Sequence, residues 1–262
     1  MKSNLNKLIT FVIIDTNIDK TMGLLKKVKK FIATNQLIAN TDTLFIGVSG
    51  GMDSVVLLSI LTSIGYKCIV GHCNFHLRGE ESDRDALFVR NLAESYKIPF
   101  HKIDFDTIAT AKSRKISIEM AARDLRYEWF KKTAQETGAT LIAVAHHSDD
   151  LAETILLNLI RGTGLKGLIG IEPKNGNIIR PLLDCSRNEI HDYALWKGLN
   201  WVLDSTNDAN DYTRNKIRNQ ITPLLSEINP SINETLNTNS KNLRGAWKIF
   251  NDKINEIKVE LV

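Results

Sequence analysis

The chain lacks the features that mark secreted, membrane-bound and disulfide-stabilised proteins. It has three cysteines, at positions 68, 73 and 185, with no C-x-x-C pair, so neither a disulfide framework nor a thiolate metal site is expected. No apolar run approaches the roughly 20 residues that cross a bilayer. The net charge of +4 permits a nucleic-acid partner but is too small to require one. We therefore expect a cytoplasmic protein that does not contact a membrane.

The first residues resemble a secretion signal only in part. Lys2 and Lys7 precede a short apolar run over residues 8–14, but Asp15 and Asp19 follow it and no small-residue cleavage site is present. Export is therefore not expected, and residues 1–21 are interpreted as an N-terminal extension.

The stretch Ser49-Gly50-Gly51-Met52-Asp53-Ser54 carries the strongest functional signal. It lies between apolar runs over residues 44–48 and 55–58, as a loop between a buried strand and a helix does. Glycine lets the backbone turn tightly, and the start of the helix presents N–H groups and a positive dipole end to phosphates. A plain glycine turn is the alternative, but the strand context and the flanking Ser and Asp side chains disfavour it.

A Walker-type loop would also carry a Lys before its last Ser or Thr, and none is present. The loop therefore predicts a grip on the β/γ-pyrophosphate of ATP as a leaving group, with Asp53 on the accompanying Mg²⁺. Such a grip leaves the α-phosphate open, and the chemistry expected there is adenylation.

Strand-like and helical segments alternate along the chain. Apolar runs predict strands over residues 44–48, 67–73, 99–105 and 141–145. Helical spacing predicts helices over residues 22–36, 53–64, 81–96, 118–136, 149–160 and 187–197, and glycines predict a loop over 162–180. This alternation predicts an α/β fold, a Rossmann-like parallel sheet with helices on both faces, whose ligand site lies beyond the carboxyl ends of the strands.

A second group of polar residues follows the last predicted strand, in the segment AHHSDDLAET at residues 145–154. On the helix that follows, Asp150 and Glu153 share a face, as do Asp149 and Glu153, while His146 lies before the helix. Such carboxylates can hold Mg²⁺, orient a substrate ammonium or remove its proton. Acids that merely complement a helix dipole would explain one or two of the three, but not the acids together with the paired histidines.

Two weaker signals lie elsewhere. Arg123 stands four residues after Glu119 on a predicted helix, and such a pair is most often a surface ion pair. Arg214, Asn215 and Arg218 form a basic cluster that either contacts RNA phosphates or simply faces solvent.

Beyond residue 230 an apolar stripe at helical spacing runs to the end of the chain. Its members are Leu236, Leu243, Trp247, Phe250, Ile254, Ile257 and Leu261. The stripe needs a cover, for which a truncated C-terminal domain, a docking surface and a homodimer partner are the alternatives. Residues 224–262 are therefore interpreted as a helical linker or the start of a truncated C-terminal domain.

Taken together, the motifs closely resemble those of the tRNA(Ile)-lysidine synthetase family of PP-loop (N-type) ATP pyrophosphatases. The resemblance covers residues 22–223, which it implies are the catalytic domain. It is carried by SGGMDS at Ser49, HCNFHLRG at His72, EMAARDLRY at Glu119, AHHSDDLAET at Ala145, RGTGLKGL at Arg161, RPLL at Arg180, DSTN at Asp204 and RNKIRNQITP at Arg214. The first motif identifies only the superfamily, whereas the ordered set is far more specific.

The resemblance implies a carbon–nitrogen ligase that uses ATP and Mg²⁺. The 2-oxo group of the wobble cytidine in the tRNA(Ile) precursor, whose anticodon is CAU, would attack the α-phosphate of ATP. The ε-amine of free lysine would then displace AMP and give lysidine. The implied roles are pyrophosphate binding by residues 49–54, Mg²⁺ binding by Asp53 and Asp150, catalytic support from His146, Asp149, Glu153 and Arg123, and tRNA contact by Arg214, Asn215 and Arg218.

Two alternatives stay open. A related PP-loop tRNA thiolase would activate a base in the same way and deliver sulfur, but Cys73 has no partner at the spacing that such enzymes use. A nucleotide-binding module without catalysis would need neither the acids after His147 nor the C-terminal basic motif.

Overall fold

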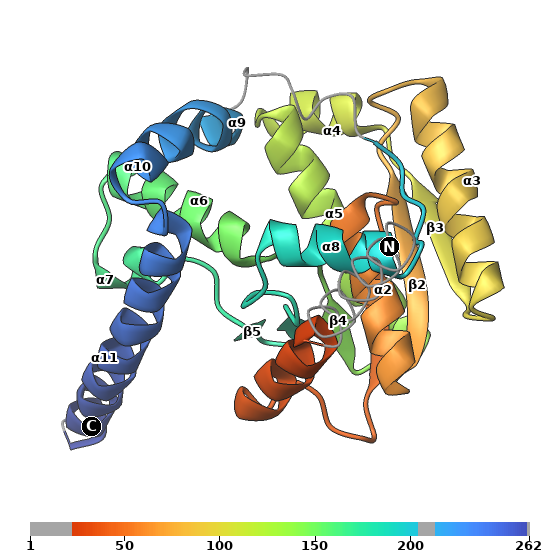
Figure 1. Ribbon diagram of the computed structural model, residues 1–262. Helices are drawn as coiled ribbons and strands as arrows, with labels where there is room; N and C mark the ends of the chain where they lie inside the picture. Colours follow the sequence, from red (N-terminus) through yellow and green to blue (C-terminus); the bar gives the residue numbers. More distant parts are fainter. Residues whose placement is uncertain (1–22, 204–212, 261–262) are drawn as a thin grey trace, which may run out of the picture. The chain divides into compact units, whose positions relative to one another are not determined.

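The computed structural model describes residues 23–203 and 213–260 (Figure 1). The chain divides into two compact units, the first comprising Met1–Ala145 and Pro173–Leu203, the second His146–Glu172 and Asp204–Val262. The two units do not meet at residue 223, so the predicted end of the catalytic domain at that residue stays a prediction. The extension over residues 1–21, the DSTN motif and Leu261 lie outside the described residues.

The first unit is built on a six-stranded sheet in the order β3-β2-β1-β4-β6-β5. The strands are β1 (Thr43–Gly47), β2 (Lys67–Asn74), β3 (Phe100–Asp104), β4 (Leu141–Ala143), β5 (Lys174–Asn175) and β6 (Ile178–Ile179). All neighbours pair in parallel except β5 and β6. The four predicted strands are confirmed, and the strand order reverses between β1 and β4, where α/β sheets of this kind bind ligands.

The predicted helices of this unit are confirmed to within two residues at each described end. They are a helix over residues 23–34, α2 (Met52–Ile64), α3 (Glu80–Ser95), α5 (Ile118–Glu136) and α8 (Arg187–Trp196). A further helix, α4 (Thr107–Arg114), was not expected because it buries only Thr107 and Ala111 and so has no apolar stripe. Its start is fixed instead by Asp106, whose Oδ1 accepts the N–H of Ala109 at 2.9 Å.

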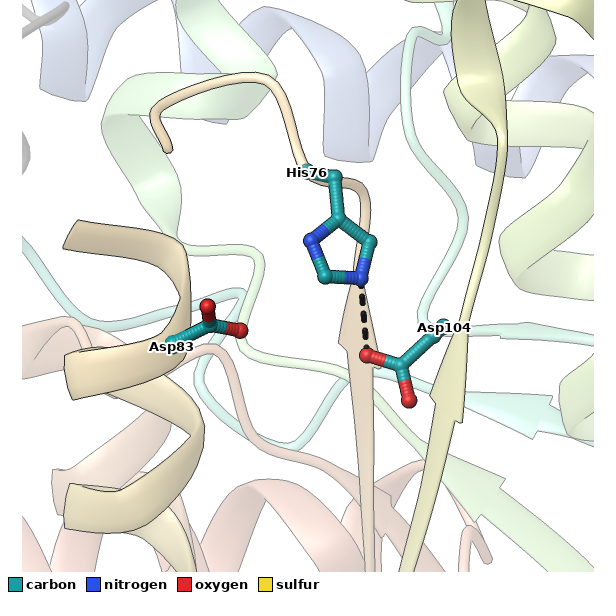
Figure 2. Close-up of side chains that lie close together, drawn as sticks. All are labelled: His76, Asp83 and Asp104. Atoms are coloured by element: carbon teal, nitrogen blue, oxygen red, sulfur yellow. Dashed lines mark hydrogen bonds and ion pairs between the residues drawn. The ribbon is translucent and has the colours of Figure 1, made fainter. Parts of the chain in front are cut away.

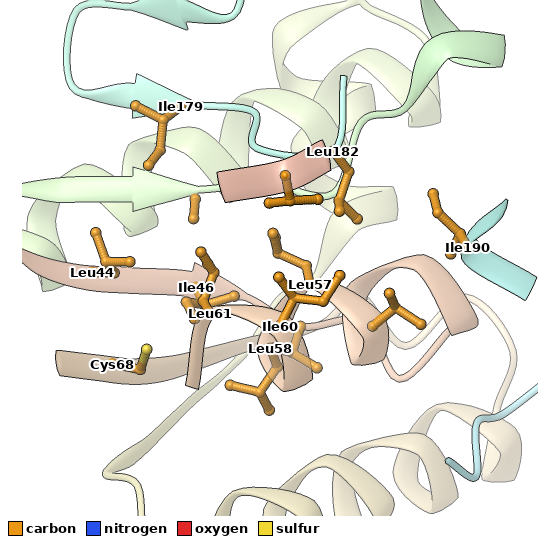
Figure 3. Packing of buried hydrophobic residues seen from close by; sticks show 14 of the residues in the cluster. Leu44, Ile46, Leu57, Leu58, Ile60, Leu61, Cys68, Ile179, Leu182 and Ile190 are labelled. Atoms are coloured by element: carbon orange, nitrogen blue, oxygen red, sulfur yellow. The ribbon is translucent and has the colours of Figure 1, made fainter. Parts of the chain in front are cut away.

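Strand β1 distributes its side chains between two cores, as the pleat of a strand requires. Leu44 and Ile46 belong to the core that also contains residues of α2, α3, α8 and the helix over 23–34 (Figure 3). Phe45 belongs to a second core with Phe130 of α5. Helix α2 is buried at every position over residues 54–61, so its first turn is held rigidly at the end of β1.

The second unit is helical. Its elements are α6 (Ser148–Arg161), α7 (Leu165–Leu168), α9 (Thr213–Lys216), the π-helical turn η2 (Ile217–Ile221), α10 (Thr222–Ile228) and α11 (Ile232–Glu260). Helix α6 contacts α7, α9, η2 and α11. The predicted loop over residues 162–180 is only partly irregular, because it contains α7 and the short strands β5 and β6.

Helix α11 packs through polar groups that an apolar pattern does not reveal. Asn237 Nδ2 donates to the carbonyl of Ser148 at 3.1 Å, and Ser240 Oγ donates to the carbonyl of Ile169 at 2.6 Å; both side chains are buried. Phe250, a member of the predicted stripe, is 53% exposed. No helix within the described ranges combines the length and apolarity needed to span a membrane.

The close approach of β1 to α5 gives a test of the second core. A Cβ at Gly47 would lie 2.6 Å from the ring of Phe130, so we expect Gly47→Ala to destabilise the fold by about 1–3 kcal/mol through overpacking. Urea unfolding followed by circular dichroism measures the loss. Gly23→Ala is the control, because no described atom lies within 4 Å of its Cβ, and its effect is expected to stay within about 1 kcal/mol. Equal stabilities for the two variants would contradict the packing argument.

Candidate functional site

The loop after β1 makes the predicted tight turn into α2. Gly50 has a φ of +96°, and its carbonyl accepts the N–H of Val202 at 3.0 Å. A Cβ on Gly50 would lie 2.7 Å from Cγ2 of Val202, so both the backbone conformation and the space require glycine. Gly51 is the N-cap of α2 at a φ of −68°, and a Cβ there would meet only Ser49 Oγ, at 3.5 Å, among the described atoms. The position of Gly51 is therefore open, as a phosphate cradle requires.

Two hydroxyls fix the shape of this loop. Ser54 Oγ donates to the carbonyl of Gly51 at 2.8 Å and accepts the N–H of Ser49 at 3.2 Å. The N–H of Gly51 donates to Ser49 Oγ at 3.3 Å. The N–H groups of Met52 and Asp53 lie in the first turn of α2, where a helix supplies no acceptor of its own. Amide N–H groups suit a phosphate chain, and the neighbouring carboxylate suits Mg²⁺. The residues present therefore fit both ATP phosphates and their metal ion.

His72 of β2 supports the same loop, a role that sequence reasoning missed. Its Nδ1 lies 2.8 Å from the carbonyl oxygen of Val48, the residue before Ser49. Burial lowers the pKa of His72, so the ring is neutral at pH 7 and Nδ1–H donates to that carbonyl. Every position of β2 from Cys68 to His72 is buried, so no alternation singled out His72, and its place beside Val48 depends on the pairing of the strands.

In the second unit, the structure brings two of the predicted acids onto one cation. Arg218 Nε donates to Glu153 Oε1 at 2.6 Å, and its Nη2 lies 3.1 Å from Glu153 Oε2 and 3.4 Å from Asp150 Oδ1. Glu153 is 4% exposed, and burial raises its pKa, an effect that the ion pair with Arg218 opposes. The shared face of Asp150 and Glu153 is therefore confirmed.

The third acid has a different partner. Asp149 Oδ1 accepts Asn233 Nδ2 of α11 at 3.0 Å, while Asp150 Oδ2 accepts the N–H of His147 at 3.0 Å and so caps α6. His147 is the buried histidine of the pair, and His146 is half-buried. Asp150 and Glu153 are thus oriented by a shared arginine, and Asp149 is oriented by Asn233.

The predicted arginines are placed as follows. Arg123 is exposed, with its guanidinium 5.2 Å from the ring centre of Tyr127, and phosphate contact stays a prediction. Arg214 donates to Thr154 Oγ1 at 3.3 Å, and Asn215 is half-buried. Arg214 and Arg218 therefore reach the acids of their own unit, a pairing across more than 60 residues that a local basic cluster cannot reveal. Their contact with tRNA also stays a prediction.

The fold and the loop define the class of protein. A family model described as a PP-loop domain matches residues 21–225. The U34-tRNA thiolase NcsA from Methanococcus maripaludis, solved with its [4Fe-4S] cluster, has a similar fold, with a TM-score of 0.71 and 19% identity over 87% of this chain and 79% of that chain. This is a PP-loop protein.

Curated relatives narrow the class. The tRNA(Ile)-lysidine synthase of Bacteroides thetaiotaomicron is 51% identical over 90% of this chain and 56% of that protein. That of Petrotoga mobilis is 40% identical over 80% of this chain and 68% of that protein. The chain belongs to the tRNA(Ile)-lysidine synthase family. It spans about half the length of the first curated relatives that it matches.

The two glycines of the loop give a paired test of the phosphate cradle. We expect Gly51→Ala to unfold at the temperature of the unchanged chain but to lose affinity for ATP, because its methyl group enters the open cradle. Gly50→Ala should lose both stability and affinity, because its methyl group meets Val202 at a strained φ. Thermal melting and the binding of a fluorescent ATP analogue measure the two effects. Full ATP affinity in Gly51→Ala would place the phosphates elsewhere.

The ion pair of Glu153 gives a pH test. Arg218→Met removes the bidentate partner of the buried Glu153 carboxylate and leaves Arg214 at 4.0 Å, which we expect to cost about 3 kcal/mol at pH 7. Because the pKa of Glu153 is raised in the folded state, the charged form opposes folding above the unfolded pKa, and protonation relieves that penalty as the pH falls. Urea unfolding at pH 5, 6 and 7 should therefore show the smallest loss at pH 5.

The control for this pH test is the double variant Arg218→Met with Glu153→Gln, which carries no charge to bury and should recover most of the stability. A loss in Arg218→Met that is equal at all three pH values would contradict the assignment.

Proposed function

We propose that this chain carries the catalytic chemistry of an ATP-dependent ligase that joins free lysine to the wobble cytidine of a tRNA(Ile) precursor. The observation that carries the proposal is the lysine-free glycine loop at the end of β1 in a chain of this family. A loop of this kind grips the outer phosphates of ATP, and the α-phosphorus then becomes the reacting atom.

In the first step, residues 49–54 bind the β/γ-phosphates through the first-turn N–H groups of α2 and through the Ser49 hydroxyl. Asp53 would supply a carboxylate ligand to Mg²⁺, which would neutralise charge on the leaving pyrophosphate. The 2-oxo group of the cytosine attacks the α-phosphorus, and the bond between that phosphorus and the bridging oxygen breaks. The products are O2-adenylated cytidine and pyrophosphate.

In the second step, the lysine ε-amine attacks C2 of the base, the C2–O bond breaks, and AMP leaves with that oxygen. The amine must lose a proton before it attacks. We assign this proton transfer to Asp150, because its ion pair with Arg218 is the weaker of the two. The distance from Arg218 is 3.4 Å to Asp150 and 2.6 Å to Glu153. Glu153, Asp149 and His146 support the ammonium group of the incoming lysine, and Asp150 is the second candidate ligand for Mg²⁺.

The cysteines disfavour sulfur transfer as the alternative. Cys68 and Cys73 are five residues apart on β2, which separates them by about 16 Å along an extended strand. Burial raises the pKa of both thiols to about 12, so neither is a thiolate at pH 7. Cytoplasmic location, contact of Arg123 with the nucleotide and a homodimer stay predictions.

The proposal predicts a specific nucleoside product. With tRNA(Ile) transcript, ATP, Mg²⁺ and lysine, we expect mass spectrometry of the digested tRNA to show lysidine in place of the wobble cytidine. Asp53→Asn should abolish product, because an amide binds Mg²⁺ far more weakly than a carboxylate, and a cooperative melting transition of the variant would show that the fold is kept. Formation of ADP and orthophosphate would overturn the reaction type.

Omitting lysine separates the two steps, because pyrophosphate release should then persist at one equivalent per enzyme-bound tRNA. ATP binding with no tRNA-dependent pyrophosphate release under either condition would support the non-catalytic module instead.

A further inference from the structure

Three metal-ligating side chains of the first unit lie together outside the phosphate loop. His76 follows β2, Asp83 lies on α3, and Asp104 ends β3 (Figure 2). Figure 2 shows the three side chains directed toward a common space from three separate elements. The HCNFHLRG motif contributes His76, and nothing in the proposed reaction uses it.

The separations between the ligand atoms suit one ion. His76 Nε2 and Asp104 Oδ1 are 2.9 Å apart. Two ligands that each lie about 2.1 Å from an ion are about 3.4 Å apart at the tetrahedral angle of Zn²⁺ sites, so a bound ion would widen the separation between His76 and Asp104 by about 0.5 Å. All three potential ligand atoms lie within 4.8 Å of one another. Any separation that exceeds the tetrahedral value can be closed by rotation of these three side chains, all of which are exposed.

A buried amide holds two of these residues in place. Asn74 is 1% exposed, its Nδ2 donates to Asp83 Oδ1 at 2.9 Å, and its Oδ1 accepts the N–H of His76 at 3.0 Å. Metal ligands are commonly oriented by a second layer of hydrogen bonds of this kind. The hydrogen bond from Asn74 uses Oδ1 of Asp83, and a carboxylate has a second oxygen that can bind an ion.

The surrounding charges admit a cation at a moderate cost. Asp83 and Asp104 carry two negative charges, and Lys102 Nζ donates to Asp104 Oδ1 at 2.9 Å. Asp106 lines the adjoining hollow of about 340 Å³ together with Phe75, Phe105 and Thr107. Phe75 and Phe105 stack at 5.7 Å between ring centres. The hollow adjoins His76 and Asp104, so water or an anion can reach the remaining coordination positions.

We propose that His76, Asp83 and Asp104 bind one divalent transition-metal ion, with Zn²⁺ as the natural candidate. An imidazole nitrogen with two carboxylates suits Zn²⁺, Co²⁺ and Ni²⁺, whereas Mg²⁺ prefers oxygen ligands alone. The site is independent of the proposed ligase reaction, because it uses none of the residues assigned to that reaction.

Titration of the full chain with Co²⁺ in excess Mg²⁺ and without ATP tests the proposal. Visible absorption of bound Co²⁺ should saturate at one ion per chain, and Zn²⁺ should displace it. His76→Ala and Asp83→Asn should each weaken binding by about tenfold or more. Lys102→Met should tighten it by about tenfold, because a competing positive charge is removed. The last result would not follow from a simple surface ion pair.

His191→Ala is the matched control, since His191 is an exposed histidine of the same unit that lies 3.8 Å from Asp192. Its affinity for Co²⁺ should equal that of the unchanged chain, and all variants should share one melting temperature. The proposal is overturned by saturation that does not depend on His76, by a thiolate charge-transfer band, by equal weakening in His191→Ala, or by the absence of binding at 100-fold excess of Co²⁺.

Discussion

The left-handed turn at Gly50 is the constraint on which the rest of the first unit depends. It connects the central strand β1 to α2, a helix buried at every position over residues 54–61. A buried helix of this kind cannot slide or tilt without opening the core, so its first turn has one position relative to the strand. Val202 fills the space where a Cβ at Gly50 would stand and donates to the same backbone. The dipole and the N–H groups of α2 are therefore aimed before any phosphate arrives, and no ordering entropy opposes its binding.

The second unit faces a different problem, which is the burial of charge. Removing Glu153 from water is costly, and only a cation with two donors at the right spacing offsets much of that cost. Arg218 meets this requirement from η2, a π-helical turn, and such turns are frequent at functional sites. Asn233 and Asn237 of α11 hold Asp149 and the backbone of Ser148 at the start of α6. The acids are thus distinguished by their partners although they are close in sequence.

Local patterns predicted the sheet and its helices because apolar residues there form continuous runs in the strands and recur at helical spacing in the helices. The run over residues 44–48 alternates between two cores, and α5 was predicted with its observed bounds. Helix α4 and the strands β5 and β6 escaped prediction because a cap and two-residue pairings leave no period. The pairing of Arg218 with Glu153 and the contact between His72 and Val48 escaped for another reason. Both join residues that are far apart in the chain, and only the folded backbone determines which charge meets which.

The two proposed cation sites follow the carboxyl ends of β1 and β2 and differ in their ligand atoms. In the pairing of β2 with β3, Asn74 lies opposite Asp104, so the amide that orients His76 and Asp83 stands beside the third proposed ligand. A slip of one residue would turn Asp104 to the other face of the sheet and abolish the cluster. The loop after β1 offers the oxygen of Asp53 beside amide donors, an arrangement that suits a hard ion already held by phosphates. The cluster after β2 offers imidazole nitrogen, and this difference in ligand type is the reason why we propose Mg²⁺ for the first site and a borderline transition metal for the second.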